Sequence, residues 1–165
     1  ITKHSDWELG AYLYEYNGAP IASVSLTSPI TLLSTNFMGN CTKSYINNKF
    51  FYFDLSKDTY FLKCDVEFIL RFFTLIKTDV NNTIYSLLGY WSNPLQIKTI
   101  AITDMTINTT ANTVTTYKTG IYDTNIPKSI AVKNNSFYIG TYATDTVTLT
   151  NNVAGFYWSL MIKQI

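Results

Sequence analysis

Much of the chain alternates between apolar and polar residues with a period of two, which predicts β-strands. In the segment 7–16, this period places Tyr12, Tyr14 and Tyr16 on one face of a strand. Asn-rich turns separate the later strand-like segments. The second half of the chain therefore predicts a series of strands, at 83–91, 96–107, 113–118, 129–133, 136–142, 146–150 and 155–163.

Between residues 36 and 63 the sequence predicts one loop and one hairpin. The aromatic segments 49–55 and 59–63 are separated by a short polar turn at 56–58, so they predict two paired strands. The stretch 36–48 ahead of them is polar and rich in Asn, which predicts a loop.

Residues 65–77 break the alternation, because Phe68, Ile69 and Leu70 are apolar in a row. The polar residues of this segment recur every three or four positions, which gives one narrow polar stripe on a 3.6-residue period. Asp65 suits the N-cap position. We therefore expect an α-helix that is apolar around most of its circumference and has to be covered from several sides.

These elements predict a single α+β domain over residues 1–165. In it, a curved antiparallel β-sheet clasps one largely buried helix, at about residues 65–77, and Glu67 forms a surface ion pair with Arg71 four residues later. The alternative is an all-β, galectin-like sandwich. No repeat or linker divides the sequence, and the start at Ile1 suggests a domain excised from a longer protein.

Composition and charge narrow the classes of partner. Aromatic residues make up 16% of the chain and charged residues only 14%, against about 25% charged residues in ordinary domains. The 12 basic and 11 acidic residues leave a formal net charge of +1, so we expect no nucleic-acid partner, because such a partner requires a basic surface. No run of about 18 apolar residues occurs, so we expect no membrane insertion by this domain.

Residues for metal binding and catalysis are scarce in the sequence. His4, Cys41 and Cys64 are too few and too scattered for a structural zinc site. A single histidine makes a Ser-His-Asp or Cys-His arrangement improbable, and Gly-rich phosphate-binding strings are absent. We therefore expect no metal, no cofactor and no enzymatic activity, with a small secreted hydrolase as the least favoured alternative. Whether Cys41 and Cys64 form a disulfide stays open.

Two clusters combine aromatic and amide side chains in the way that sugar-binding sites do. Aromatic rings pack on the CH patches of a sugar, while Asn, Asp and Ser side chains hydrogen-bond its hydroxyl groups. The plainer alternative is that Trp91 anchors the core and that Asn125 is a turn residue. The candidate glycan-binding residues are Tyr90, Trp91 and Asn93 in segment 89–94, and Tyr122, Asp123 and Asn125 in a loop at 120–127.

The end of the chain resembles the head domain of the rotavirus spike protein. Residues 132–142 (VKNNSFYIGTY) and 156–162 (FYWSLMI) are similar in residue character to the end of that domain, where a turn, a Tyr-bearing strand and an aromatic strand follow one another. The resemblance covers roughly the last 35 residues. The helix-clasping architecture expected above is similar to the group B head, which binds N-acetyllactosamine-type glycans, rather than to the galectin-like group A head.

The resemblance implies an attachment head on the virion surface, joined to the remainder of the spike protein in the outer capsid. Such a head binds host cell-surface glycans of the galactose or N-acetyllactosamine type without catalysis. The alternative function is a fibre-knob-type module that binds a protein receptor.

Overall fold

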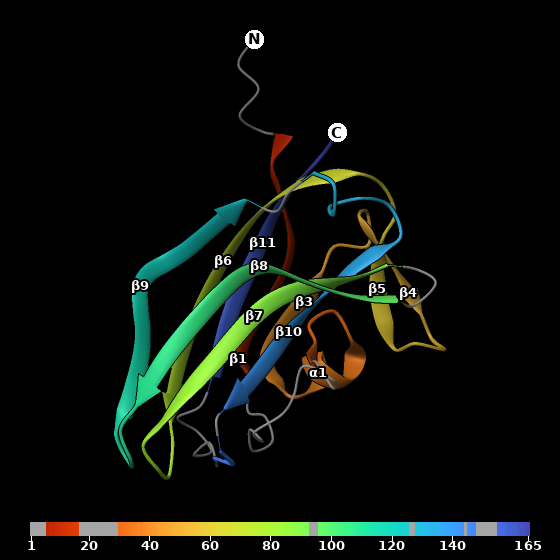
Figure 1. Cartoon of the computed structure of the whole chain (residues 1–165). Helices are drawn as coiled ribbons and strands as arrows, with labels where there is room; N and C mark the ends of the chain where they lie inside the picture. Colours follow the sequence, from red (N-terminus) through yellow and green to blue (C-terminus); the bar gives the residue numbers. More distant parts are fainter. Residues whose placement is uncertain (1–5, 17–29, 93–95, 126–127, 144, 148–154) are drawn as a thin grey trace.

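Antiparallel strands form most of the regular structure in the computed structural model of the chain (Figure 1). It describes residues 6–16, 30–92, 96–125, 128–143, 145–147 and 155–165. The larger sheet has five strands in the order β3-β1-β11-β6-β9. In chain order these strands are β1 (Glu8–Tyr16), β3 (Cys41–Ile46), β6 (Val66–Lys77), β9 (Val114–Asn125) and β11 (Gly155–Gln164).

A second sheet, one hairpin and one short helix complete the described structure. The second sheet has four strands in the order β2-β10-β7-β8, and β4 pairs with β5 in the hairpin. These elements are β2 (Ile30–Thr31), α1 (Thr35–Gly39), β4 (Phe51–Asp54), β5 (Thr59–Leu62), β7 (Asn82–Ser92), β8 (Gln96–Thr109) and β10 (Asn135–Ala143). No helix within the described ranges has both the length and the apolar composition to cross a membrane.

The two larger sheets pack face to face, with the core between them (Figure 1). The rings of Phe68 on β6 and Phe137 on β10 meet edge to face across this core, with 5.1 Å between their centroids. Two antiparallel sheets joined by inward-facing side chains form a β-sandwich. Each sheet contributes alternate residues to the core, among them Leu13, Phe68, Leu70, Trp158 and Leu160 from the larger sheet and Phe137 and Ile139 from the smaller one.

The helix predicted at residues 65–77 is wrong, because this segment forms strand β6. The strand lies inside the larger sheet and pairs with β11 on one side and β9 on the other. Buried and more exposed residues alternate along its first half, with Val66, Phe68 and Leu70 buried and Glu67, Ile69 and Arg71 more exposed.

Ile69 is the source of this error. An apolar residue on the outer face of a strand produces three apolar residues in a row, and periodicity alone cannot distinguish such a run from a buried helix. The β-branched and aromatic residues of the segment favour a strand, and two flanking strands satisfy its backbone. The expected α+β fold is therefore wrong, and the all-β alternative agrees with the structure. The expected similarity to the group B spike head was inferred from this helix, so the fold does not support that similarity.

The strand conformation also changes the partners of Glu67. Its carboxylate pairs with the Lys128 ammonium at 3.2 Å and with the Lys163 ammonium at 3.4 Å, instead of the predicted partner Arg71. The hydrogen bond from Lys128 is the main reason that the pKa of Glu67 lies below its ordinary value.

Two further predictions for this part of the chain have opposite outcomes. The hairpin predicted at 49–63 is confirmed by the pairing of β4 with β5. The loop predicted at 36–48 is wrong, because helix α1 and strand β3 occupy most of it. The two cysteines, which the sequence left open, are free thiols in the structure.

Candidate functional site

The six residues predicted to bind glycans do not form one site on one sheet. Tyr90 and Trp91 lie near the end of β7 in the four-stranded sheet. Asn93 lies outside the described residues. Tyr122, Asp123 and Asn125 belong to strand β9, at the edge of the five-stranded sheet, so the loop predicted at 120–127 is a strand as far as Asn125.

Tyr90 and Trp91 point to opposite faces of their sheet, as neighbours on a strand do. Tyr90 is paired with Phe137 and packs against the core cluster. Trp91 is paired with Ser136 and contacts the ring of Tyr138, with 6.3 Å between the centroids. The two rings therefore do not form one joint platform. That any of the six residues contacts a glycan stays a prediction.

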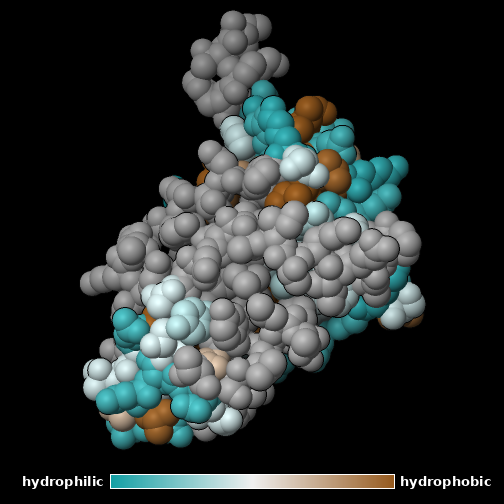
Figure 2. Space-filling model, viewed as in Figure 1, coloured by the Kyte–Doolittle hydropathy of each residue, from teal (hydrophilic) through white to brown (hydrophobic). Residues whose placement is uncertain are grey.

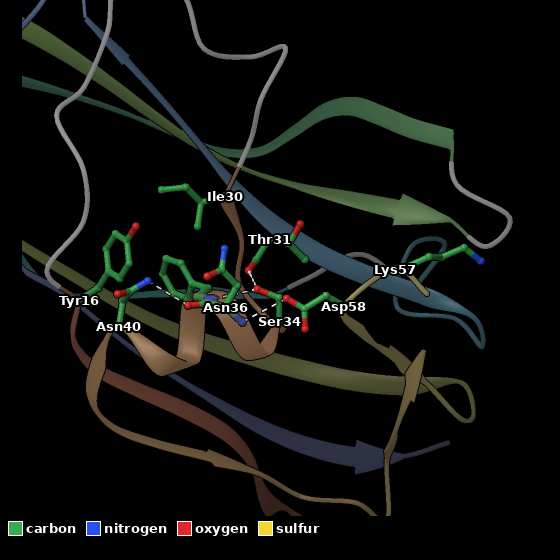
Figure 3. A pocket seen from close by; sticks show the side chains of 9 residues that line it. Tyr16, Ile30, Thr31, Ser34, Asn36, Asn40, Lys57 and Asp58 are labelled. Atoms are coloured by element: carbon green, nitrogen blue, oxygen red, sulfur yellow. Dashed lines mark hydrogen bonds between the residues drawn. The ribbon is translucent and has the colours of Figure 1, made fainter. Parts of the chain in front are cut away.

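A cleft of about 320 Å³ lies over helix α1 and brings together segments that are distant in the sequence (Figure 3). Ligand-binding pockets of this volume are at the lower end of the usual range, which suits a small ligand. Most of the lining side chains end in an amide, a hydroxyl or a carboxylate. The residues that line the cleft are Tyr16, Ile30, Thr31, Ser34, Asn36, Phe37, Asn40, Lys57 and Asp58.

Helix α1 holds its place under the cleft through caps at its N-terminus. Ser34 is the N-cap residue, and its hydroxyl accepts a hydrogen bond from the backbone N–H of Phe37 at 3.0 Å. The same hydroxyl donates to the carbonyl of Thr31 at 3.0 Å. A five-residue helix is too short to be stable by itself, so these bonds and its packing fix it.

Asp58 completes the capping from the turn between β4 and β5. Its backbone has a φ of 46°, in the left-handed region that Asp tolerates better than most residues. Its carboxylate accepts the backbone N–H groups of Thr35 and Asn36, both at 3.1 Å, and the hydroxyl of Thr35. Desolvation alone would raise the pKa of Asp58, but these hydrogen bonds outweigh it and lower the pKa.

Tyr16 closes the cleft on the side of β1. Its ring stacks on Phe37 with 4.2 Å between centroids and is 9% exposed. Burial, and then the neighbouring Cys41 thiol, raise the pKa of the Tyr16 hydroxyl. Burial raises the pKa of Cys41 to about 11, so this thiol is a weak nucleophile.

The exposed amides of Asn36 and Asn40 give the cleft its hydrogen-bonding capacity. The Asn40 amide donates to the backbone carbonyl of Asn36 at 3.0 Å, which fixes its orientation. An amide has two donor hydrogens and one acceptor oxygen, so both side chains keep groups for a ligand. Ile30 supplies an apolar wall on the same cleft (Figure 3). This combination can bind a small, polar, hydroxyl-bearing molecule.

No group of three or more His, Cys, Asp or Glu side chains could hold a metal ion within the described part of the chain. The carboxylate of Asp58 and the hydroxyl of Ser34 are both engaged in capping α1. Both groups therefore hold the N-terminus of α1 in place.

A second candidate surface is the outer side of the five-stranded sheet, where four tyrosines gather. We name it the tyrosine face and define it by Tyr12, Tyr14, Tyr45 and Tyr157. Tyr12 stacks on Tyr45 at 5.8 Å, and Tyr14 meets Tyr157 edge to face at 4.8 Å. Tyr14 is 47% and Tyr45 is 40% exposed, so two large rings of this face are open to solvent.

Sequence reasoning found only half of the tyrosine face. The predicted row of Tyr12, Tyr14 and Tyr16 is broken, because Glu15 has a φ of 55° and Tyr16 turns into the core cluster. Tyr45 was missed because it lay in a predicted loop. Tyr157 lies on the outer face and is half-buried, whereas its neighbour Trp158 is buried in the core.

Comparisons with known proteins place the chain in no family. No family of known proteins and no curated protein matches the sequence. Among solved structures, one chain of "Structure of infectious bursal disease virus Gx strain" aligns over 94% of this chain, at 10% identity and a TM-score of 0.36. The alignment covers 31% of that chain, so this chain spans about a third of its length. A TM-score of this size does not show a common fold. That neighbour is viral, and nothing in the match bears on rotavirus, on attachment or on glycan binding.

Proposed function

We propose that this domain is the head of a viral attachment protein and binds host cell-surface glycans in the cleft over α1. The head acts at the virion surface, is joined to the remainder of a spike protein, and works without catalysis or a cofactor. The ligand class is the galactose or N-acetyllactosamine type. The relationship to rotavirus is part of the proposal and rests on the resemblance of residues 132–142 and 156–162.

The observation that carries the proposal is the amide-lined cleft itself. Sugars offer many hydroxyl groups that both donate and accept hydrogen bonds, and the amides of Asn36 and Asn40 do the same. The Ile30 side chain is available for the CH groups of a sugar ring. A small cleft with few contacts gives weak binding at each site, which several copies on one particle strengthen.

Asn36→Ala is expected to weaken the binding of N-acetyllactosamine about ten-fold, the effect of losing one or two hydrogen bonds. Alanine has a higher helix propensity than asparagine, so α1 should keep its stability. The measurement is an NMR titration of the purified domain with N-acetyllactosamine at neutral pH, together with a thermal melt.

Asn48→Ala is the matched control for this experiment. Asn48 is exposed in the turn before β4 and does not line the cleft. Its replacement should leave the affinity as in the unaltered domain. Equal affinities for all three proteins would contradict binding at α1, and a domain that binds no galactose-terminated glycan at all would contradict the function.

The tyrosine face favours a second candidate function, a knob-type module that contacts a protein receptor. Tyrosines are enriched at protein interfaces, because they present a large rigid surface with a polar end. The double substitution Tyr14→Ser and Tyr45→Ser should abolish cell binding that survives enzymatic removal of cell-surface glycans. This candidate would be rejected if the domain no longer binds cells after their glycans are removed, while the double variant still binds untreated cells.

A further inference from the structure

We propose that Asp58 makes the cleft over α1 select against glycans that end in an acidic sugar. This inference rests on the proposed glycan-binding function and adds a specificity-determining residue to it. It rests on the fixed charge of Asp58, the engagement of Lys57 outside the cleft, and the neutral amides of Asn36 and Asn40.

The charge of Asp58 is held in one place at the wall of the cleft. The carboxylate bridges the backbone N–H groups of Thr35 and Asn36 at 3.1 Å each, so it cannot swing away from a ligand without uncapping the helix. Hydrogen bonding to the ionised form keeps the carboxylate charged at neutral pH. A ligand carboxylate entering the cleft would therefore meet a negative charge (Figure 3).

The one basic residue that the structure describes in the cleft lining is Lys57, and it is engaged elsewhere. Its ammonium lies 3.2 Å from the carboxylate of Asp54 and 5.7 Å from the ring centroid of Phe61. Both contacts draw the cation toward the β4–β5 hairpin. Recognition of a carboxylate usually relies on an arginine fork, and the lining residues that the structure describes include no arginine.

The remaining ligand-binding groups favour uncharged sugars. Asn36 and Asn40 can donate to and accept from hydroxyl groups without a charge of their own. Favourable contacts to a neutral glycan together with a repulsive contact to its acidic derivative are the usual way in which a site becomes specific.

The experiment compares N-acetyllactosamine with its sialylated form, each titrated into the same domain by NMR. The unaltered domain is expected to bind the sialylated form about ten-fold more weakly, and Asp58→Asn should reduce this ratio to about two-fold by removing the repulsion. Asparagine keeps one acceptor oxygen for the N–H and hydroxyl of Thr35 and loses the acceptor for the N–H of Asn36, so a thermal melt of the variant checks that α1 and the cleft persist. Asp145→Asn is the control, because it removes the same charge from an exposed residue outside the cleft lining and should leave the ratio unchanged.

Salt provides a second measurement that needs no variant. Raising the ionic strength from about 0.05 M to about 0.5 M screens exposed charges. In the unaltered domain this should reduce the ratio between the affinities for N-acetyllactosamine and for its sialylated form. Equal affinity for both glycans, a ratio that Asp58→Asn does not change, or a ratio insensitive to salt would each overturn the inference while the glycan-binding function stands. Absence of binding to both glycans would instead overturn the proposed function.

Discussion

Phe68→Ala is expected to lower the free energy of unfolding by about 3–5 kcal/mol, the usual cost of truncating a buried phenylalanine. Phe68 is 2% exposed and contacts Phe137 across the two sheets. Its ring also lies parallel to that of Phe51, at 6.4 Å and 11°. Truncation therefore leaves a cavity where the two sheets and the hairpin meet. Urea unfolding followed by tryptophan fluorescence measures the loss.

Ile69→Ala tests the strand assignment against the helix that the sequence suggested. Ile69 lies next to Phe68 but on the outer face of β6. Its truncation should therefore lower the free energy of unfolding by only about 1 kcal/mol. A helix that is apolar around most of its circumference would bury both side chains. Comparable losses of unfolding free energy in Phe68→Ala and Ile69→Ala would therefore contradict the strand assignment.

The β-rich character of the chain could be predicted from its sequence, and the helix could not be excluded. The period of two identified β1, and the polar turn at 56–58 identified the β4–β5 hairpin, because both signals are local. The conformation of 65–77 depends on β9 and β11, which pair with it from distant parts of the chain. Non-local pairing of this kind overrides local periodicity.

The cleft over α1 lay beyond sequence reasoning for the same reason. Thr35 and Asp58 are 23 residues apart. No short sequence motif predicts that Asp58 caps the helix that begins at Thr35. Ser34 is a local N-cap signal, but a five-residue helix leaves too short a pattern to detect. The separation of Tyr90 from Trp91 was predictable, because adjacent residues of a strand point to opposite faces.

Gly89→Ala is expected to destabilise the domain by about 3 kcal/mol, because it forces a side chain into a filled space. A Cβ atom at Gly89 would overlap the Cζ and Oη atoms of Tyr138. Tyr138 is 1% exposed and is held by the edge contact with Trp91, so its ring has little room to move. Thermal and urea unfolding of the variant measure the loss.

Gly39→Ala is the matched control, since a Cβ at that position in helix α1 has no atom within 4 Å apart from its chain neighbours and the helix's own backbone. It should leave stability unchanged or raise it slightly, because alanine favours a helix. The double variant Gly89→Ala with Tyr138→Leu should be less destabilised than the sum of the single variants, because the smaller side chain removes the overlap. Strict additivity would show that the Tyr138 ring is not what excludes a side chain at Gly89.

The Gly89→Ala variant also separates two locations for the glycan site. The lining residues that the structure describes for the cleft over α1 include none from β7, whereas Trp91 lies two residues from Gly89 and touches the displaced ring. If the folded variant keeps its affinity for N-acetyllactosamine, the glycan binds at the cleft. If the affinity falls while Asn36→Ala has no effect, the ligand contacts Trp91, and the surface of the four-stranded sheet is the binding site.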